Sequence, residues 1–325
     1  MAALKDELKV FSGRSNPRLS EAICDYLGVP PGRVQAETFP DGELFVRLLD
    51  DVRGRDVFVV QSTCRPVNDN LMELLIFMDS LRRASARRIT AVLPYFGYAR
   101  QDRKDEGRVP ITAKLVSNLI RKAGADRVLT MDLHAAQIQG FFDIPVDHLS
   151  AEPAFLRHYG NLLEPENSML VSPDVGNVKR ARAYAEQMGV DLAIIDKRRT
   201  SGSSAVMYNI IGNVEGRDVL MIDDMIATAG TLYEAAKILR QRGARSIRGA
   251  ATHAVLAGPA LERLGGVDLT EVAVTDTIPV SAEAPKRIKN FTVLSVADIL
   301  GEAIARIHTH QSVSSLFNNR TTRKT

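Results

Sequence analysis

Short apolar runs alternate with amphipathic segments along most of this chain. Residues 219–222 form a continuous apolar run, as expected of a parallel strand buried on both faces. The run ends in two adjacent carboxylates, Asp223 and Asp224, and a loop of small residues leads to residues 232–242, whose pattern predicts a helix. Because strand and helix patterns alternate throughout, the sequence predicts an α/β fold with parallel sheets.

The same order of elements occurs twice. Residues 54–60 and 216–222 both begin Gly-Arg-Asp-Val and enter an apolar strand. Each strand is followed by a polar loop and a helical pattern (residues 71–84 in the first half). A similar short connection to the next strand then follows in both halves, at residues 86–89 and 244–247. The order repeats although few residues are identical, which indicates a duplicated βαβ unit.

Length and composition bound the domain organisation. A chain of 325 residues exceeds the usual size of one hydrophobic core, so we expect domains at residues 1–150 and 151–310, with a tail at 311–325. The net charge of +3 is too small to indicate binding to nucleic acid or membrane. Cys24 and Cys64 form no disulfide or metal-binding pattern. The first residues do not resemble a signal peptide, so we expect a cytoplasmic protein.

The loop at residues 228–231 is a candidate anion site. It lies where free backbone N–H groups and the positive end of a helix point, and its hydroxyls and glycine suit a phosphate. Asp223 and Asp224 beside it can accept hydrogen bonds from ribose hydroxyls, which indicates a sugar phosphate. In the first half, residues 61–66 occupy the matching place and cannot do the same.

Other interpretations of these residues stay open at this point. A buried strand that ends in an ordinary capped helix has the same pattern, and paired aspartates also coordinate magnesium in nucleotide hydrolases. The sequence contains neither a G-x-x-x-x-G-K-[ST] phosphate loop nor a G-x-G-x-x-G fingerprint. A P-loop NTPase and a dinucleotide-binding enzyme are therefore disfavoured.

Two cationic segments follow strand patterns elsewhere. Residues 100–108 carry four cations in nine positions, and residues 197–199 follow the apolar Ile194-Ile195 and lead into a polar stretch at 200–204. With a sugar-phosphate pocket, two such loops predict a substrate with several phosphates, either diphosphate or ATP. His134 and Asp174 end apolar segments in matching places of the two halves. A lone histidine is more often structural than a ligand, and imidazole is not a preferred ligand of magnesium.

Taken together, these segments resemble the ribose-phosphate diphosphokinase family of the phosphoribosyltransferase-like superfamily. The resemblance covers nearly the whole chain, and the motifs that carry it are residues 98–104, 132–135, 137–143, 196–199 and 223–231. It implies two duplicated phosphoribosyltransferase-type domains, each a mainly parallel sheet flanked by helices. It also implies a transferase that moves the diphosphoryl group of ATP to ribose 5-phosphate, as a kinase of nucleotide biosynthesis.

The resemblance also implies roles for single residues. The catalytic cations would be Lys197 and Arg199, and the magnesium ligands His134 and Asp174. The ATP site would comprise Phe39, Asp41, Gly42, Glu43, Arg100, Gln101 and Lys104. The ribose 5-phosphate site would comprise Arg199, Asp223, Asp224, Ala227, Thr228, Ala229, Gly230 and Thr231. Candidate regulatory residues are Arg53, Ser85, Ser312 and Ser314.

Members of this family use Mg2+ and assemble as homo-oligomers, usually hexamers, in which a neighbouring subunit completes the adenine site. This chain departs from the family pattern at Ala227, where Asp is frequent, at Glu106 in a usually more basic loop, and at Asn177, where glycine is common. If position 177 requires a positive φ, asparagine is among the better substitutes for glycine. The alternatives are a phosphoribosyltransferase that consumes the activated sugar and a non-catalytic regulatory homologue.

Overall fold

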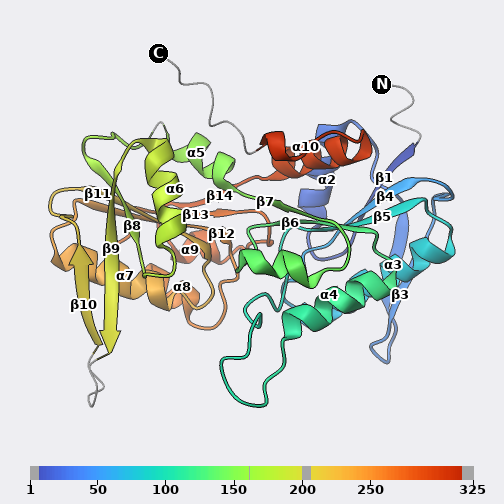
Figure 1. Cartoon of the computed structure of the whole chain (residues 1–325), viewed down its shortest axis with the longest axis horizontal. Coiled ribbons are helices and arrows are strands. Elements are labelled where there is room, and N and C mark those ends of the chain that lie inside the picture. The colour runs from blue at the N-terminus through green and yellow to red at the C-terminus, as the bar shows by residue number, and fades with distance from the viewer. Residues whose placement is uncertain (1–6, 161, 200–205, 317–325) are drawn as a thin grey trace. The chain divides into compact units, whose positions relative to one another are not determined.

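The structure is a computed structural model that describes residues 7–160, 162–199 and 206–316, with only the backbone at 197–199, 206–208 and 315. It divides into two compact units (Figure 1). The first contains the chain up to Ser150, Thr277–Pro279 and the chain from Ser295 onward; the second contains Ala151–Asp276 and Val280–Leu294. The sequence-based boundaries put all of residues 151–310 in one domain, whereas the last long helix belongs to the first unit.

The first unit is built on a five-stranded sheet whose neighbouring strands are all parallel. Its strands are, in spatial order, β1 (Leu8–Ser12), β4 (Asp56–Val60), β5 (Arg88–Leu93), β6 (Arg127–Met131) and β7 (Val146–Leu149). The strands β2 (Val34–Thr38) and β3 (Leu44–Leu48) form a separate antiparallel hairpin, and β3 packs against α3 (Val67–Arg83). Helix α3 begins before residue 71, directly after Pro66, because the proline ends the extended loop.

Helices α2 (Pro17–Leu27), α4 (Thr112–Ala123) and α10 (Ala297–His308), with the 3-10 turns η1 (Ala136–Phe141) and η2 (Ser314–Leu316), complete this unit. The side chain of Asn16 caps α2 by accepting from the Leu19 N–H, and Pro17 provides a preformed first turn. Gly28, at φ 64°, ends the helix in a left-handed conformation.

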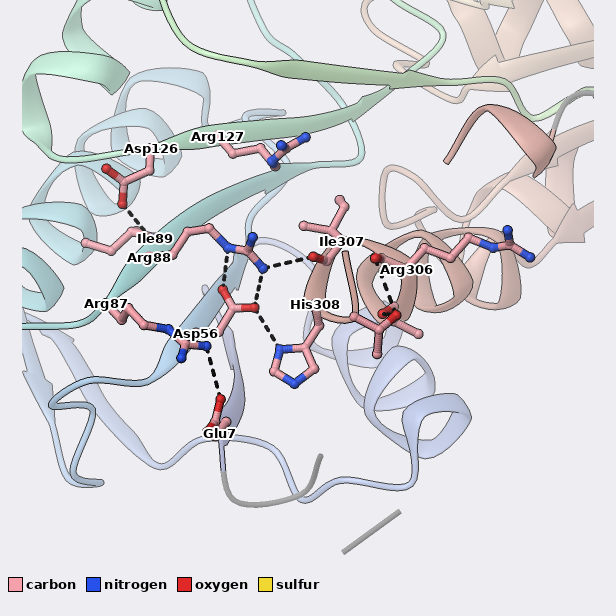
Figure 2. Close-up of polar contacts among 12 residues, drawn as sticks. Glu7, Asp56, Arg87, Arg88, Ile89, Asp126, Arg127, Arg306, Ile307 and His308 are labelled. Atoms are coloured by element: carbon pink, nitrogen blue, oxygen red, sulfur yellow. Dashed lines mark hydrogen bonds and ion pairs between the residues drawn. The ribbon is translucent and has the colours of Figure 1, made fainter. Parts of the chain in front are cut away.

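The C-terminal helix α10 is held in the first unit by a buried carboxylate. Figure 2 shows Asp56, the first residue of β4, between Arg88 and His308. Arg88 donates from Nε to Asp56 (2.8 Å) and from Nη2 to the Ile307 carbonyl (3.0 Å), while His308 Nδ1 lies 2.7 Å from Asp56 Oδ2. Since Asp56 is 0 % exposed, the Arg88 guanidinium and the His308 ring compensate for its lost hydration. Helix α10 also packs along α2.

The second unit is built on a seven-stranded sheet. Its strands are, in spatial order, β10 (Val206–Ile211), β9 (Asp191–Arg199), β8 (Ser168–Ser172), β11 (Asp218–Met225), β12 (Ser246–His253), β13 (Glu271–Thr275) and β14 (Phe291–Leu294). Only the β9–β10 pair is antiparallel. The chain therefore proceeds one way from β8 through β9 and the other way from β11 onward, so the strand order reverses between β8 and β11.

The helices of this unit are α5 (Glu152–Tyr159), α6 (Val178–Met188), α7 (Gly230–Gln241), α8 (Ala260–Gly265) and α9 (Ala284–Arg287). Helix α7 begins at Gly230 rather than at residue 232, so the last part of the predicted loop is the first helical turn. Residues 197–199 belong to β9 rather than following a strand, because they pair with β10. The polar stretch at 200–204 lies outside the described residues.

The two units follow one plan, as the repeated order of elements predicts. Strands β1, β4, β5, β6 and β7 match β8, β11, β12, β13 and β14 in chain order and in sheet order. Between the first two strands of each set lie a helix and an antiparallel pair, β2–β3 in one unit and β9–β10 in the other. Each unit has its own buried apolar cluster, so the predicted α/β fold with mainly parallel sheets is confirmed. Among the described helices, none has the length and apolar composition needed to cross a membrane.

Candidate active site

A cavity of about 550 Å³ lies in the second unit, where the strand order reverses. Its walls come from the loop after β8, from β9, from the loop and helix after β11, and from α8. The lining residues are Pro173, Asp174, Ile195, Thr228, Gly230, Thr231, Tyr233, Glu234, Ala235 and Arg263. Crevices at the carboxyl ends of parallel strands, beside such a reversal, are the usual ligand sites of open α/β sheets.

The loop between β11 and α7 forms one wall of this cavity. Ala229, with φ 58°, adopts a left-handed conformation and precedes the first helical residue, Gly230. A methyl group cannot cap a helix, so the N–H groups of the first turn of α7 remain available to a ligand. The hydroxyl-bearing Thr228 and Thr231 line the cavity. This is the geometry of an anion site at a helix N-terminus.

Asp223 and Asp224 lie near the end of β11, directly after its apolar residues, as the sequence predicts. Asp224 is buried, and its backbone N–H donates to Asp223 Oδ1 (2.8 Å). Burial and the neighbouring Asp224 raise the pKa of Asp223 to about 7. The two carboxylates therefore share a site in which one holds a proton easily, and both can accept hydrogen bonds from sugar hydroxyls when ionised.

Asn177 and Arg180, at the start of α6, face these carboxylates. The Asn177 side-chain amide donates to the Ile222 carbonyl (3.1 Å) and to Asp223 Oδ1 (3.0 Å). Arg180 Nη1 lies 3.9 Å from Asp223 Oδ1 and 3.8 Å from Asp224 Oδ1. Asn177 has φ −92°, so the position needs no positive φ in this chain, and its side chain serves the Asp223 carboxylate instead.

The two predicted magnesium ligands belong to different units. His134 is exposed in the loop after β6 of the first unit. Asp174 is exposed after β8 of the second unit, lines the cavity and accepts from the Asn177 N–H (2.9 Å) at Oδ1. Among the residues that the structure describes, no three His, Cys, Asp or Glu side chains gather as a metal cluster.

The predicted adenine-binding residues form the tip of the β2–β3 hairpin. Phe39 is 41 % exposed, and its ring lies 5.6 Å from that of Phe45, centroid to centroid. Gly42, at φ 94°, allows the turn that returns the Glu43 carbonyl to the Phe39 N–H (2.8 Å). The hairpin therefore presents an exposed aromatic ring on a fixed turn.

Residues 100–108 form an irregular loop between β5 and α4, as predicted. Arg100 and Lys104 are exposed. Gln101 lies at the base of the loop: its N–H donates to the Tyr98 carbonyl (2.9 Å), and its side-chain Oε1 accepts from the Thr112 hydroxyl (2.5 Å). The loop is thus anchored at Gln101 and carries its cations outward.

The remaining predicted residues are described only in part. Lys197 and Arg199 lie in β9, opposite Tyr208 and Val206 of β10, and the structure gives their backbone alone. Arg53 donates from Nη1 to the Ser85 hydroxyl (3.2 Å), so these two candidate regulatory residues lie together. The Ser312 carbonyl accepts from Arg306 (3.1 Å), and Ser314 begins η2.

Sequence reasoning missed several residues of the cavity. Tyr233 and Glu234 follow the recognised loop and lie on the first turns of α7, so helical geometry alone brings them to the wall. Arg263 lies in α8, about thirty residues beyond the loop, in a segment without a polar motif. Only the fold brings Arg263 to this cavity.

Family models match both halves of the chain. Residues 8–124 match the N-terminal domain of ribose phosphate pyrophosphokinase, and residues 200–318 match the phosphoribosyl synthetase-associated domain.

Relatives and a solved structure extend the likeness to nearly the full length. A ribose-phosphate pyrophosphokinase of Rhodopirellula baltica is 57 % identical over 97 % of this chain and 99 % of its own. Ribose-phosphate pyrophosphokinase 1, chloroplastic, of Arabidopsis thaliana is 52 % identical over 95 % of this chain and 77 % of its own. The crystal structure of phosphoribosylpyrophosphate synthetase from Mycobacterium smegmatis is 43 % identical, with a TM-score of 0.86 over 94 % of this chain and 99 % of that one. The fold, the cavity at the strand reversal and these matches agree, and the chain belongs to the ribose-phosphate pyrophosphokinase family.

Proposed function

We infer that this chain is the enzyme that transfers the diphosphoryl group of ATP to the anomeric hydroxyl of ribose 5-phosphate, which gives 5-phosphoribosyl 1-diphosphate and AMP. The observation that carries this inference is the identity of 57 % over 97 % of the chain with a ribose-phosphate pyrophosphokinase. The reaction makes the activated sugar of nucleotide biosynthesis. No observation favours a transferase that consumes this product.

Ribose 5-phosphate binds in the cavity of the second unit. The 5-phosphate lies against residues 228–231, where the first N–H groups of α7 and two threonine hydroxyls converge. Asp223 and Asp224 accept hydrogen bonds from the ribose hydroxyls. The backbone provides most of the phosphate contacts, so Ala227, which brings no carboxylate, is compatible with this role.

ATP binds through residues of the first unit. Arg100, Gln101 and Lys104 contact the nucleotide from the loop after β5, and the hairpin tip with Phe39 binds the adenine of a neighbouring subunit. The exposed ring of Phe39 supports this assignment, because an aromatic ring in water is stabilised by stacking on a base. The hairpin residues Asp41, Gly42 and Glu43 complete the adenine site. The protein is accordingly a homo-oligomer, a hexamer as in the family, in the cytoplasm.

Lys197 and Arg199 of β9 are the catalytic cations. ATP and ribose 5-phosphate repel each other, and negative charge grows on the bridging oxygen as the anomeric oxygen attacks the β-phosphorus. Positioning and cations supply most of the catalysis of such transfers, and a well-placed arginine contributes roughly 10³–10⁵ in rate. Arg199 also contacts ribose 5-phosphate.

Mg2+ is the cofactor of this proposal, and His134 and Asp174 would hold it. The exposed carboxylate of Asp174, at the cavity wall, is the type of oxygen donor that magnesium prefers. When bound, the ion neutralises charge between the phosphates. Arg53, Ser85, Ser312 and Ser314 contribute to a regulatory anion site, for which the Arg53–Ser85 contact gives support.

The test is a coupled assay of AMP release from ATP and Mg2+, with and without ribose 5-phosphate. We expect AMP only with the sugar, matched by 5-phosphoribosyl 1-diphosphate. Lys197→Ala should lower kcat at least ~10³-fold, with oligomeric state unchanged by size-exclusion chromatography. Lys286→Ala, at an exposed lysine paired with Glu283, is the matched control. A folded, oligomeric wild type that releases no AMP would instead indicate a regulatory homologue.

A further inference from the structure

The loop between β11 and α7, called the phosphate loop below, is held by hydrogen bonds from the segment that follows β12 to its backbone carbonyls. The carbonyls of Ile226 and Ala227 accept from the N–H groups of Leu256 and Ala257, each at 2.9 Å. The next carbonyl, that of Thr228, accepts from Arg263 Nη1, also at 2.9 Å. Three successive carbonyls are thus satisfied from the β12–α8 side, the last one by a side chain rather than by backbone.

Arg263 acts where the loop is under most strain. Ala229, directly after Thr228, has φ 58°, a conformation that costs a residue with a Cβ about 1 kcal/mol. The guanidinium also lies over Gly230, since a Cβ at that position would come within 3.3 Å of Arg263 Nη1. A bond to the carbonyl before Ala229 and a contact after it together hold the turn in place.

The charge of Arg263 matters as well as its hydrogen bond. It lines the cavity together with the acidic residues Asp174 and Glu234. Among the lining residues that the structure describes, Arg263 is the only cation. Because a phosphate dianion must enter beside two carboxylates, the guanidinium offsets part of their repulsion.

We propose that Arg263 is a positioning residue for the 5-phosphate: it fixes the turn at Thr228–Ala229 through the Thr228 carbonyl and places a positive charge at the cavity wall. The proposal rests on the proposed ribose 5-phosphate site and adds a residue outside its sequence motif. The planar guanidinium suits this position because one N–H can bond the carbonyl while the plane covers Gly230. The 5-phosphate is remote from the bond that forms, so Arg263 stabilises the bound substrate and the transition state equally.

The experiment compares Arg263→Met and Arg263→Lys with Arg242→Met, a control at an exposed arginine near the end of α7. For Arg263→Met we expect the KM for ribose 5-phosphate to rise about ten-fold or more, with kcat and the KM for ATP nearly unchanged. Arg263→Lys should be intermediate. Calorimetry should show the same loss of affinity for ribose 5-phosphate, and weaker competition by inorganic phosphate. A loss of general stability alone would not produce this selectivity.

Two further variants separate the possible failures. Arg263→Gln keeps a polar side chain at this position without the charge, so a rise in the KM for ribose 5-phosphate in this variant supports the proposal even if Arg263→Met does not fold. Thr228→Val tests the site itself. If Thr228→Val raises this KM and both Arg263→Met and Arg263→Gln leave it unchanged, the role of Arg263 is refuted and the site stands. If Thr228→Val also leaves it unchanged, the site assignment falls too. An equal rise in the KM for ATP in Arg263→Met likewise overturns the proposal.

Discussion

The β4–α3 region of the first unit and the β11–α7 region of the second both begin with the sequence Gly-Arg-Asp-Val, but they differ in the residues that follow the strand. Asp56 faces Arg88 in the sheet register, and Asp218 faces Ser246 in the same way. Five positions further along, Gln61 in the first unit occupies the place of Asp223 in the second.

Gln61 is 1 % exposed and fully used within the first unit. It accepts from the Ser15 N–H (3.1 Å) and donates to the Asn70 carbonyl (3.1 Å). Ser62 and Thr63 are buried too. In the second unit the corresponding carboxylates, Asp223 and Asp224, precede the loop that forms one wall of the cavity. This cavity lies where the sheet continues from β8 to β9 and its order reverses. The repeated sequence therefore specifies the strand and the helix, while the presence of a further strand beside β8 determines whether a cavity forms.

The aspartates at the amino-terminal ends of the same two strands differ in how far they are buried. Asp56 is buried beneath α10 with Arg88 and His308, whereas Asp218 keeps 19 % of its side chain exposed beside Arg245 and Ser246. Both carboxylates pair with arginine. Only the first has lost its water, so only there does the pairing decide the stability of the unit.

The largest expected effect tests this difference. Asp56→Ala leaves the partly buried Arg88 and the buried His308 without their shared acceptor, and should lower the free energy of unfolding by about 3–5 kcal/mol. Asp218→Ala should cost much less, because water replaces the lost carboxylate at an exposed arginine. Urea titrations of both variants measure the contrast. Equal losses would mean that cover by α10 does not matter.

A second, smaller effect is a pH dependence confined to the second unit. The pKa of Asp223 is raised to about 7 from an ordinary 3.8, so between these values the folded chain holds a proton that the unfolded chain has lost. Stability should therefore fall as the pH rises from about 4 to about 7 and then level off. The slope should be shallow, since 31 % of this side chain is exposed.

Asp223→Asn makes this position neutral, like Gln61 in the first unit, and should flatten that part of the profile. Urea midpoints measured from pH 5 to pH 8 on the ligand-free protein give the comparison. A variant profile as steep as that of the wild type would assign the slope to other groups.

The smallest expected effect distinguishes two asparagines at the starts of matching helices. Asn16 caps α2 through the Leu19 N–H, whereas Asn177 reaches from the start of α6 to Asp223. Asn16→Ala should lower the free energy of unfolding by about 1 kcal/mol with unchanged kinetics. Asn177→Ala should raise the KM for ribose 5-phosphate about five-fold, the value of one hydrogen bond, with nearly unchanged stability. The reverse pattern would contradict both assignments.

The sequence predicts most of the fold because apolar runs and repeated segments are local signals. It also predicts the segment of small residues between β11 and α7, since Thr228, Gly230 and Thr231 are close in the chain. It does not predict the contact of Arg263 with the Thr228 carbonyl or that of Asn177 with Asp223, because each forms only after strands distant in sequence have paired. The prediction that residues 197–199 follow a strand was wrong for a similar reason. They pair with β10, which extends β9 through them, and a local pattern does not reveal this pairing.

The return of α10 to the first unit has a consequence for synthesis of the chain. Strands β1 to β7 leave the ribosome long before α10, which pairs with α2 and delivers His308 to Asp56. Until α10 is made, the apolar face of α2 and the carboxylate of Asp56 lack the helix that covers them in the folded unit. The second unit, enclosed between β7 and α10 in the chain, can complete its sheet earlier. The unit that begins first on the ribosome is thus the one that finishes last.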